Sequence, residues 1–480
     1  MVETPASGRY SGAGRRRLVE RRVAEGPGPA RLRGEPAPPD APCSPVVAAA
    51  ALNLAMRVGD CLLSAGMSAN DVVVVLLRIT AAYRLTRVHV DVTYTSLSAS
   101  YYPGPEAAPI TCIRVVRPDV VDYTRVRELD KLSDDIEGGL SIDGAIAKFE
   151  RINAAPHPYP QWLSTAGNAG VGAGVSLLFT TSWKIVLVTF LAGCVIDRLL
   201  ALLQRVRVPP FFQQAAAAAL ITGIAAGITA AANHGVQFFD GLDPTLVVVG
   251  GIVLLVSGMT VVGAVQDAID QFYVTASARM FEVAMLTAGI VVGIVLALKV
   301  APHLGAPVYI SPDPIGLGPL WAQFVGAAMT SGLFALWAYA DVLTTALSAA
   351  TGLLGWAGYT AMIHGGSSEV PANAVGALAA ALVATLIVRR TNIPGFALIS
   401  AALLPLVPGL SLYNGLLELV GTSTAPANTA TGSSTLALAV SVALGIAAGA
   451  SLGTYLGRPL ADQMRRIRTH ARRHRSTADA

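Results

Sequence analysis

The chain has 480 residues, of which 53% are hydrophobic and only 13% charged, and its mean hydropathy is +0.56. A soluble protein of this composition could not cover itself with polar surface, so the composition excludes that class and indicates a membrane protein. The net charge is +4, and arginines concentrate near the two ends, at residues 15–22 and 465–473. This placement favours contact with anionic lipid headgroups and argues against a nucleic-acid partner.

Charge is unevenly distributed along the chain. Of the 64 charged residues, 37 precede Ser164 and 18 lie in residues 165–457. A soluble head, a membrane body and a basic tail are therefore expected. We divide the chain into a disordered Arg/Pro-rich tail without a signal peptide (1–44), a cytoplasmic α+β domain (45–160), two five-helix membrane repeats (161–303 and 304–457) and a basic cytoplasmic tail (458–480).

The head begins with two apolar helices. Residues 46–66 form one apolar run closing on Gly66, a residue suited to a helix C-terminus, and we interpret it as a helix of the head rather than a membrane span. Ser68 and Asn70 are candidate caps for a second helix that ends near Arg84.

A sheet and polar helices follow. Residues 88–102 alternate β-branched and aromatic residues with polar ones, the turn-forming PGPEAAP comes next, and residues 110–117 read as another strand. Residues 123–152 favour polar helices with a break at Gly138 and Gly139 and a new cap at Ser141. His89 and Asp91 share one strand face, but two residues without a third ligand do not make a metal site.

Ten later segments are apolar enough to cross a hydrocarbon core of about 30 Å, which takes on the order of 20 residues. With the head inside, the predicted inner loops carry most of the arginines, including Arg205 and Arg279, whereas the outer loops carry only Lys184 and Lys299. The positive-inside rule then places both termini in the cytoplasm. The predicted spans are 164–181, 185–203, 211–232, 244–265, 279–300, 318–337, 342–362, 370–388, 393–416 and 435–455.

The membrane body contains an internal repeat. LLVSGMTVVGAVQDAI, from Leu254, aligns without gaps with PLVPGLSLYNGLLELV, from Pro405. The alignment places Gly258 on Gly409, Thr260 on Ser411 and Asp267 on Glu418. Each copy would hold five spans, and an odd number inverts the second copy, which is a transporter architecture with a substrate site near the repeat interface. The alternative is chance similarity between two glycine-rich apolar helices.

The ninth predicted span is broken by prolines. Pro394, Pro405 and Pro408 accompany Gly395 and Gly409, and each internal proline removes a backbone hydrogen bond. Unwound segments of this kind can bind substrate and ions through backbone groups in transporters, although a tolerated kink is the simpler alternative for any single proline. The polar residues that flank them, and that could hydrogen-bond a zwitterion or a hydroxyl, are Asn392, Ser400, Ser411, Tyr413 and Asn414.

Proton coupling needs an ionisable group near membrane depth, and carboxylates are the usual choice. The candidates are Asp197, Asp267, Glu282 and Glu418. Asp267 and Glu418 come first because the repeat superimposes them, although each lies near a span end and could be a solvated interfacial group. For Asp197, an ion pair with the adjacent Arg198 is the simpler interpretation.

Two pairs of segments resemble the threonine/serine exporter family. LNLAMRVGDCLLSAGMSANDV and RVHVDVTYTSLSASYY resemble its soluble domain, whereas ATGLLGWAGYTAM and VRRTNIPGFALISAALLPLVPGLSLYNGLLEL resemble its second membrane half. The resemblance implies a proton-driven exporter of small amino acids such as threonine and serine in the bacterial inner membrane. It implies no cofactor, and homo-oligomer formation stays open.

Other functions remain as alternatives. Small dicarboxylates such as succinate are a second substrate class, although no Lys or Arg lies near the middle of a predicted span to pair with a diacid. A membrane-anchored enzyme is disfavoured because the head has no GxSxG, P-loop or HExxH motif, and four cysteines without CxxC spacing predict neither a disulfide nor a zinc site. A channel or lipid-handling protein would be excluded only by flux against a gradient.

Overall fold

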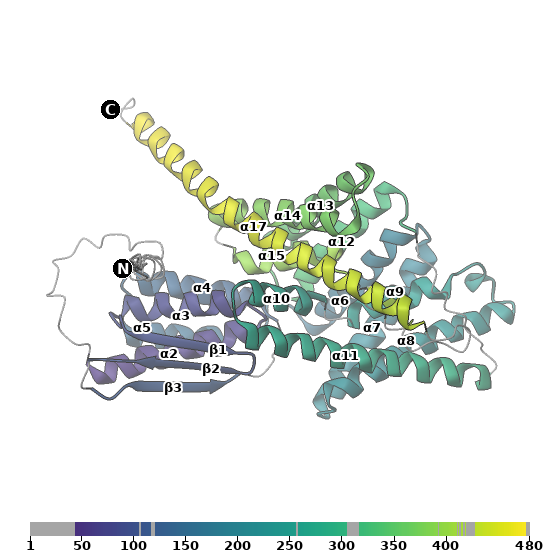
Figure 1. Cartoon of the computed structure of the whole chain (residues 1–480), viewed down its shortest axis with the longest axis horizontal. Helices are drawn as coiled ribbons and strands as arrows, with labels where there is room; N and C mark the ends of the chain where they lie inside the picture. Colours follow the sequence, from purple (N-terminus) through teal and green to yellow (C-terminus); the bar gives the residue numbers. More distant parts are fainter. Residues whose placement is uncertain are drawn as a thin grey trace, which may run out of the picture. The chain divides into compact units, whose positions relative to one another are not determined.

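Apolar helices make up most of the structure, and one small sheet lies near its N-terminal end (Figure 1). The computed structural model describes residues 44–104, 107–116, 121–255, 258–304, 316–391, 393–409, 411, 414–415, 418 and 428–476. Residues 44–480 form one compact unit. We call residues 44–160 the head.

Four helices of the head follow the predicted pattern. They are α2 (Pro45–Ser64), α3 (Ala69–Ala82), α4 (Tyr123–Glu137) and α5 (Ile142–Ala154). Gly66 stops α2 with a positive φ of 91°, a conformation that glycine adopts without steric cost. The Ser68 hydroxyl accepts from the Asp71 N–H at 3.2 Å and the Ser141 hydroxyl from the Gly144 N–H at 3.3 Å, so both serines cap helices as predicted.

The sheet is a three-stranded antiparallel meander in the order β1-β2-β3, with β1 at Val88–Thr93, β2 at Ser96–Tyr101 and β3 at Ile110–Val115. The prediction of a single strand over residues 88–102 is wrong, because these residues form a hairpin that pairs Thr93 with Ser96. Its turn, Tyr94 and Thr95, contains none of the glycine or asparagine that usually marks a two-residue turn. The buried face of β2, formed by Leu97, Ala99 and Tyr101, packs towards α2.

Helix α2 is long and apolar enough to cross a membrane. It packs instead against α3, α5 and the strands β2 and β3, and Leu52, Ala55 and Met56 are at most 1% exposed. Much of its apolar surface is therefore buried within residues 44–160, and its assignment to a cytoplasmic domain stays a prediction.

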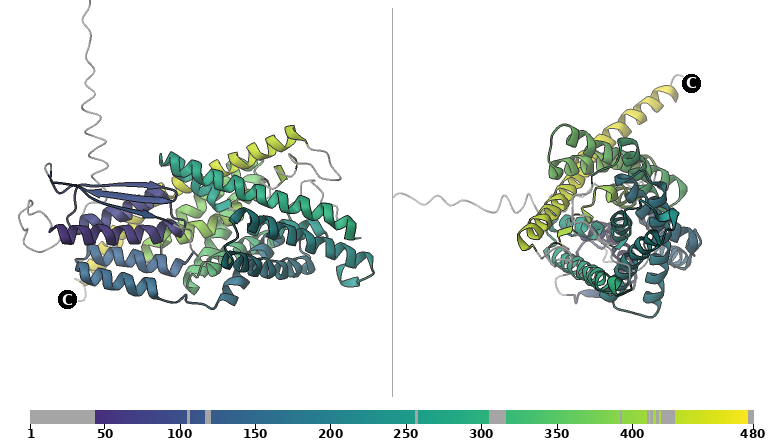
Figure 2. Two further views of the ribbon diagram at one scale, coloured as in Figure 1. Left: turned by 90° about the horizontal axis from the view of Figure 1, so that it is seen from below. Right: turned by 90° about the vertical axis from the view of Figure 1, so that its right-hand side faces the viewer.

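Two sets of helices follow the head. The first membrane set contains α6 (Gln161–Phe179), α7 (Trp183–Arg205), α8 (Pro210–Asn233), α9 (Pro244–Leu255), α10 (Gly258–Ile269) and α11 (Tyr273–Val300), with short 3-10 turns at Gln237–Phe239 and Ala301–Leu304. The second membrane set contains α12 (Leu320–Trp337), α13 (Val342–His364), α14 (Glu369–Thr391), α15 (Gly395–Leu403), the 3-10 turn η3 (Leu404–Leu406) and α17 (Thr429–Ser476). The two longest helices are α11 and α17, and the C-terminal end of α17 extends beyond the other helices (Figure 2).

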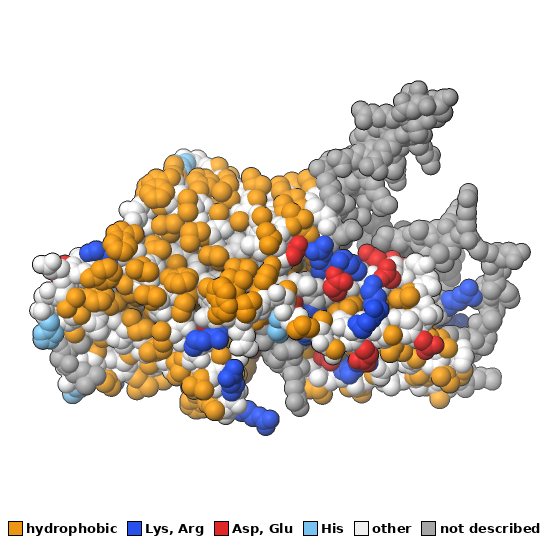
Figure 3. Space-filling model, turned by 180° about the vertical axis from the view of Figure 1, so that it is seen from behind, with side chains coloured by type: hydrophobic (Ala, Val, Ile, Leu, Met, Phe, Trp, Pro, Cys, Tyr) orange, Lys and Arg blue, Asp and Glu red, His pale blue; other side chains and the backbone are white. Residues whose placement is uncertain are grey.

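Within the described residues, seven helices are long and apolar enough to cross a membrane, α2 included, and the bent pair α9–α10 raises the number to eight. The chain is thus a largely helical protein with several candidate spans. Helices α6 and α13 fall outside this set, so ten spans stays a prediction. Exposed apolar side chains such as Leu191, Val195 and Leu202 cover the membrane sets, whereas charged side chains gather over the head (Figure 3).

Packing within the first membrane set recurs in the second. The first helix of each set packs on the second (α6 on α7, α12 on α13), and the third packs on the fifth (α8 on α11, α14 on α17). The fourth helix of each set, which is short, packs on the first and second helices. In the first set α9 packs on α6 and α7, and in the second set α15 packs on α12 and α13. The two sets meet through their first helices, α6 and α12, and also where α10 packs on α17.

Glycines bring α6 and α12 close together. A Cβ added at Gly326 would lie 2.6 Å from the Gly174 carbonyl oxygen, and one added at Gly174 would lie 2.7 Å from Thr330 Oγ1. Small residues let membrane helices approach to backbone contact. The junction between the two sets is therefore tightly fixed at this seam.

Candidate functional site

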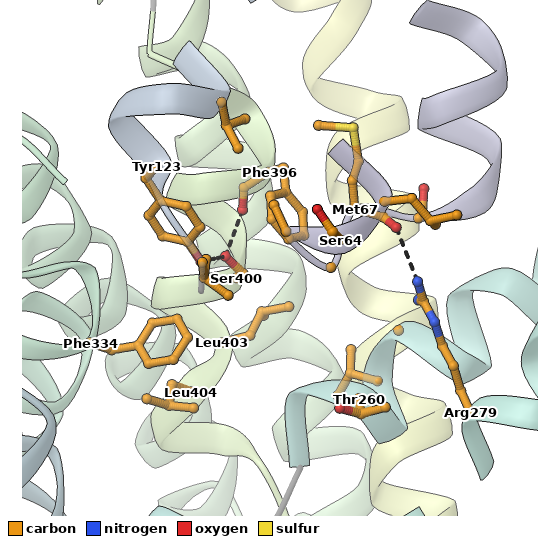
Figure 4. Close-up of a pocket in the computed structure, with 18 of the residues that line it drawn as sticks. Ser64, Met67, Tyr123, Thr260, Arg279, Phe334, Phe396, Ser400, Leu403 and Leu404 are labelled. Carbon is orange, nitrogen blue, oxygen red and sulfur yellow. Dashed lines mark hydrogen bonds between the residues drawn. The ribbon is translucent and has the colours of Figure 1, made fainter. Parts of the chain in front are cut away.

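A cavity of about 2070 Å³ lies where the head meets both membrane sets. The head contributes the loop after α2, the β1–β2 turn and the start of α4. The first set contributes residues of α6 to α11, and the second set contributes α12, α15 and α17. Figure 4 shows how Ser64, Met67 and Tyr123 of the head approach Thr260, Arg279 and Ser400 of the membrane sets.

The first membrane set holds the head through two charged side chains, Asp267 and Arg279, that pair with each other and hydrogen-bond to backbone groups of the head. Arg279 Nη1 lies 2.9 Å from Asp267 Oδ2, and their side chains are 6% and 0% exposed. The Ala69 N–H donates to Asp267 Oδ1 at 2.9 Å, and Arg279 Nη2 donates to the Met67 carbonyl at 3.1 Å (Figure 4). We call Met67, Ala69, Asp267 and Arg279 the Asp267 cluster. Its carboxylate stabilises the N-terminus of α3, where an amide lacks a partner inside the helix and the helix dipole favours negative charge.

Helix α11 presents further polar side chains to the head at helical spacing from Arg279. One turn earlier, the Thr275 hydroxyl donates to the Val92 carbonyl at 3.0 Å. One turn later, Glu282 accepts from the Tyr94 hydroxyl. Burial raises the pKa of Tyr94, as does its hydrogen bond to Glu282, so this phenol stays protonated at physiological pH.

The second membrane set holds the head through α4. The Tyr123 N–H donates to the Ala338 carbonyl at 2.8 Å, and the Tyr123 hydroxyl lies 2.5 Å from Ser400 Oγ. The ring of Tyr123 makes edge-to-face contacts with the rings of Phe334 and Phe396, with centroid distances of 6.4 and 6.0 Å. These five residues are the Tyr123 cluster. Burial raises the pKa of Tyr123, so the cluster is uncharged.

Asp197 is the candidate carboxylate with the most partners. It accepts from Thr165 Oγ1 at 2.8 Å and from Asn168 Nδ2 at 2.9 Å, both on α6, and its Oδ2 lies 2.6 Å from Arg198 Nη2. The predicted pair with Arg198 is therefore present, but it belongs to a larger polar group that ties α7 to α6. Asp197, Asn168 and Arg198 line the cavity.

The proline-rich segment is interrupted where its sequence predicts. Pro394 precedes α15, which ends at Leu403, and Pro405 lies in the 3-10 turn that follows. Beyond it, the Gly409 N–H donates to the Val407 carbonyl at 2.8 Å. Pro394 and Gly395 line the cavity, so the start of α15 faces it.

The structure gathers some of the predicted residues and separates others. The cavity is lined by Asp197, Glu282, Thr260, Pro394 and Gly395. Asn392 and Tyr413 lie outside the described residues, and Gly258 opens α10 directly after a gap in them. The described candidates that are not among the lining residues are Asp267, Pro405, Pro408, Gly409, Ser411, Asn414 and Glu418.

Asp267 and Glu418, which the repeat superimposes, have different surroundings. Asp267 is fully buried against the head. Glu418 is half-buried, and its Oε2 accepts from Thr435 Oγ1 at 2.9 Å. Their roles in coupling stay predictions.

Sequence reasoning missed Arg279 and Tyr123 as site residues. Thr275, Arg279 and Glu282 are spaced i, i+4 and i+7, which places them on one face at the start of an otherwise apolar helix, and this spacing was the available signal. Tyr123 had none, because its partners are 215 and 277 residues away along the chain.

The cavity offers groups of both charges and several hydroxyls. Carboxylates and arginines line it together with Ser64, Thr260 and Ser400, a combination that suits a small zwitterion carrying a hydroxyl. Within the described ranges, no group of three or more His, Cys, Asp or Glu side chains is arranged to hold a metal ion.

Comparison with known proteins points in one direction. Residues 53–301 match a family described as "Putative threonine/serine exporter", and residues 323–452 match one described as "Threonine/Serine exporter, ThrE". A Mycobacterium tuberculosis protein named "Probable threonine/serine exporter" is 36% identical over 75% of this chain and 68% of its own length. The "Threonine/serine exporter" of Corynebacterium glutamicum is 30% identical over 79% of both chains. No solved structure matches.

Proposed function

Because the chain belongs to the threonine/serine exporter family, we propose that it exports small hydroxylated amino acids such as threonine and serine, driven by the proton gradient. Membership makes the chain a transporter and not an enzyme, and its apolar helices make it a membrane protein. What we propose beyond this is the substrate, the driving force and the location of the protein in the bacterial inner membrane.

The observation that carries the proposal is the cavity where the head meets both membrane sets. Its volume of about 2070 Å³ exceeds the roughly 300–1,000 Å³ of ordinary small-molecule sites. It therefore suits a hydrated vestibule in which an amino acid contacts only part of the wall. Asp197 is the carboxylate we assign to the substrate ammonium, and Thr260 is a hydroxyl partner. The backbone at Pro394 and Gly395 is the part of the broken segment that could contact substrate.

The recurrence of packing between the two sets supports an inverted-repeat architecture. Alternating access in such transporters is largely a rocking of one repeat against the other around a fixed site. The contact of α6 with α12 would be the axis of this motion, because glycines fix it at backbone distance. We propose five spans in each set on this basis.

The proposed orientation places the head in the cytoplasm as an α+β domain. Arg279 is among the arginines assigned to that side, and it contacts the head directly. The basic ends of the chain would then meet anionic lipids of the inner leaflet. Protons would couple through Glu418 or Asp267, the two carboxylates that the repeat aligns.

Transport by the purified chain in proteoliposomes tests the proposal. Threonine, serine and succinate are offered separately, with and without an imposed pH gradient, and empty liposomes control for leakage. We expect threonine and serine flux that the gradient accelerates and that continues against a substrate gradient. Succinate flux without threonine flux would assign the dicarboxylate class instead, and flux only down a gradient would indicate a channel.

A further inference from the structure

We propose that the head is a gate over the cavity, which opens at the Asp267 cluster and pivots at the Tyr123 cluster. The proposal rests on the proposed function only in treating the cavity as a substrate pathway. It assigns Asp267 and Arg279 as positioning residues that hold the gate closed.

The head closes one part of the cavity. The end of α2 and the loop that follows it supply the lining residues Leu62 to Ser68, and the β1–β2 turn supplies Tyr94 and Thr95. The Asp267 cluster fixes this loop to α10 and α11, since Arg279 binds the Met67 carbonyl and Asp267 binds the Ala69 N–H. Separation of these contacts would move wall residues away from the cavity.

The two clusters differ in the chemistry that holds them. The Tyr123 cluster is uncharged and packs with buried alanines, among them Ala335, Ala397 and Ala401, so exposing it to water would lose apolar burial. The Asp267 cluster binds the head through two hydrogen bonds between charged side chains of the membrane set and backbone groups of Ala69 and Met67. Water can replace both hydrogen bonds when the head moves away, and Asp267 and Arg279 stay paired with each other, so these hydrogen bonds are the contact suited to repeated opening.

The chain connection lies on the pivot side. His157, in the segment that leads from α5 to α6, places Nδ1 2.7 Å from Asp122 Oδ2, and its ring stacks on Tyr339 at 4.4 Å. Asp122 caps α4 through the Arg125 N–H at 2.9 Å. The covalent link between head and membrane sets thus lies beside Tyr123, and the loop that carries Met67 and Ala69 is the part of the head that would swing.

Thiol labelling tests the gate. The full chain carries alanine in place of its four cysteines, Thr260→Cys is added as a reporter in the cavity wall, and the detergent-purified protein reacts with a bulky hydrophilic maleimide. We expect Asp267→Asn and Arg279→Gln each to raise the labelling rate about tenfold, because each leaves an unpaired charge or lost contacts in the closed state. Arg279→Lys, which keeps the charge, should give a smaller increase than Arg279→Gln.

A matched control is available inside the head. Glu150→Gln breaks the ion pair with Arg57, whose Nη1 lies 2.7 Å from Glu150 Oε1, without touching either cluster, and it should leave the labelling rate unchanged. Tyr123→Phe keeps the apolar pivot and should change it less than twofold. If Asp267→Asn is not monodisperse, Tyr94→Phe is measured instead, because it removes the hydroxyl that donates to Glu282 on the same side of the head.

Equal labelling in the parent and in the Asp267 and Arg279 variants would overturn the gate. An equal rise in Glu150→Gln would do so as well, because it would indicate general loosening of the head. The labelling assay needs no transported solute. The gate proposal can therefore be wrong while the proposal of threonine transport is right, and it can be right in a protein that transports another solute.

Discussion

Single polar residues in an apolar helix bundle reveal their roles through their partners. Asp197 accepts hydrogen bonds from two side chains of α6 and lines the cavity, so its carboxyl group is held where a substrate ammonium could reach it. Glu418, by contrast, has a single described side-chain partner, Thr435, and is not among the residues that line the cavity. The two carboxylates are therefore assigned different tasks.

Asp197→Asn should lower the initial rate of threonine export at least tenfold, because the amide cannot pair with an ammonium group while its size is unchanged. Export by proteoliposomes measures the effect. Asp240→Asn, at an exposed position after the turn that follows α8, is the matched control and should export normally. Normal export by Asp197→Asn would remove this residue from the proposed site.

Glu418→Gln should abolish the dependence of export on the pH gradient, since an amide takes up no proton, while membrane insertion is retained. Thr435→Val is the companion change, because it removes the hydroxyl bound to Glu418 and keeps the carboxylate, so gradient dependence should survive. The coupling proposal fails if Glu418→Gln and Asp267→Asn both export at the normal rate with normal pH dependence.

At the level of elements, the contact of α6 with α12 decides how firmly the two membrane sets are joined. Gly326→Ala should destabilise the protein by about 1–3 kcal/mol, the usual cost of overpacking, because its Cβ would lie 2.6 Å from a backbone oxygen. Gly223→Ala on α8 is the control, since a Cβ there meets nothing within 4 Å. Thermal unfolding in detergent should show a lower midpoint for Gly326→Ala only, and equal midpoints would contradict the close packing.

The elements could be predicted from the sequence to a large extent, because their signals are local. Ser68, Ser141 and Gly66 mark helix ends by their own chemistry, and Pro394 and Pro405 interrupt the helical segment that contains them. The β1–β2 hairpin was missed because Tyr94 and Thr95 are not typical turn residues. The contact of Asp267 with Ala69 joins residues 198 positions apart, and no local pattern specifies such a pair.

For the whole molecule, the head is bound to both membrane sets at the cavity and not only at its covalent link. Two chemically distinct contacts connect it to these sets, namely the hydrogen bonds of Asp267 and Arg279 to backbone groups of the head and the uncharged, largely apolar Tyr123 cluster. The head and both membrane sets, which would move in the proposed transport cycle, therefore all border the cavity. The central claim is accordingly that the substrate enters this cavity.

Substrate protection of a cavity cysteine tests that claim most directly. Ser451→Cys on α17 lines the cavity, whereas Ser277→Cys on α11 is exposed and is not among the lining residues. In a cysteine-free background, we predict that threonine slows maleimide labelling of Ser451→Cys in a saturable manner, that succinate does not, and that neither affects Ser277→Cys. Labelling of Ser451→Cys that is unchanged at saturating threonine, in protein that transports threonine, would contradict the account.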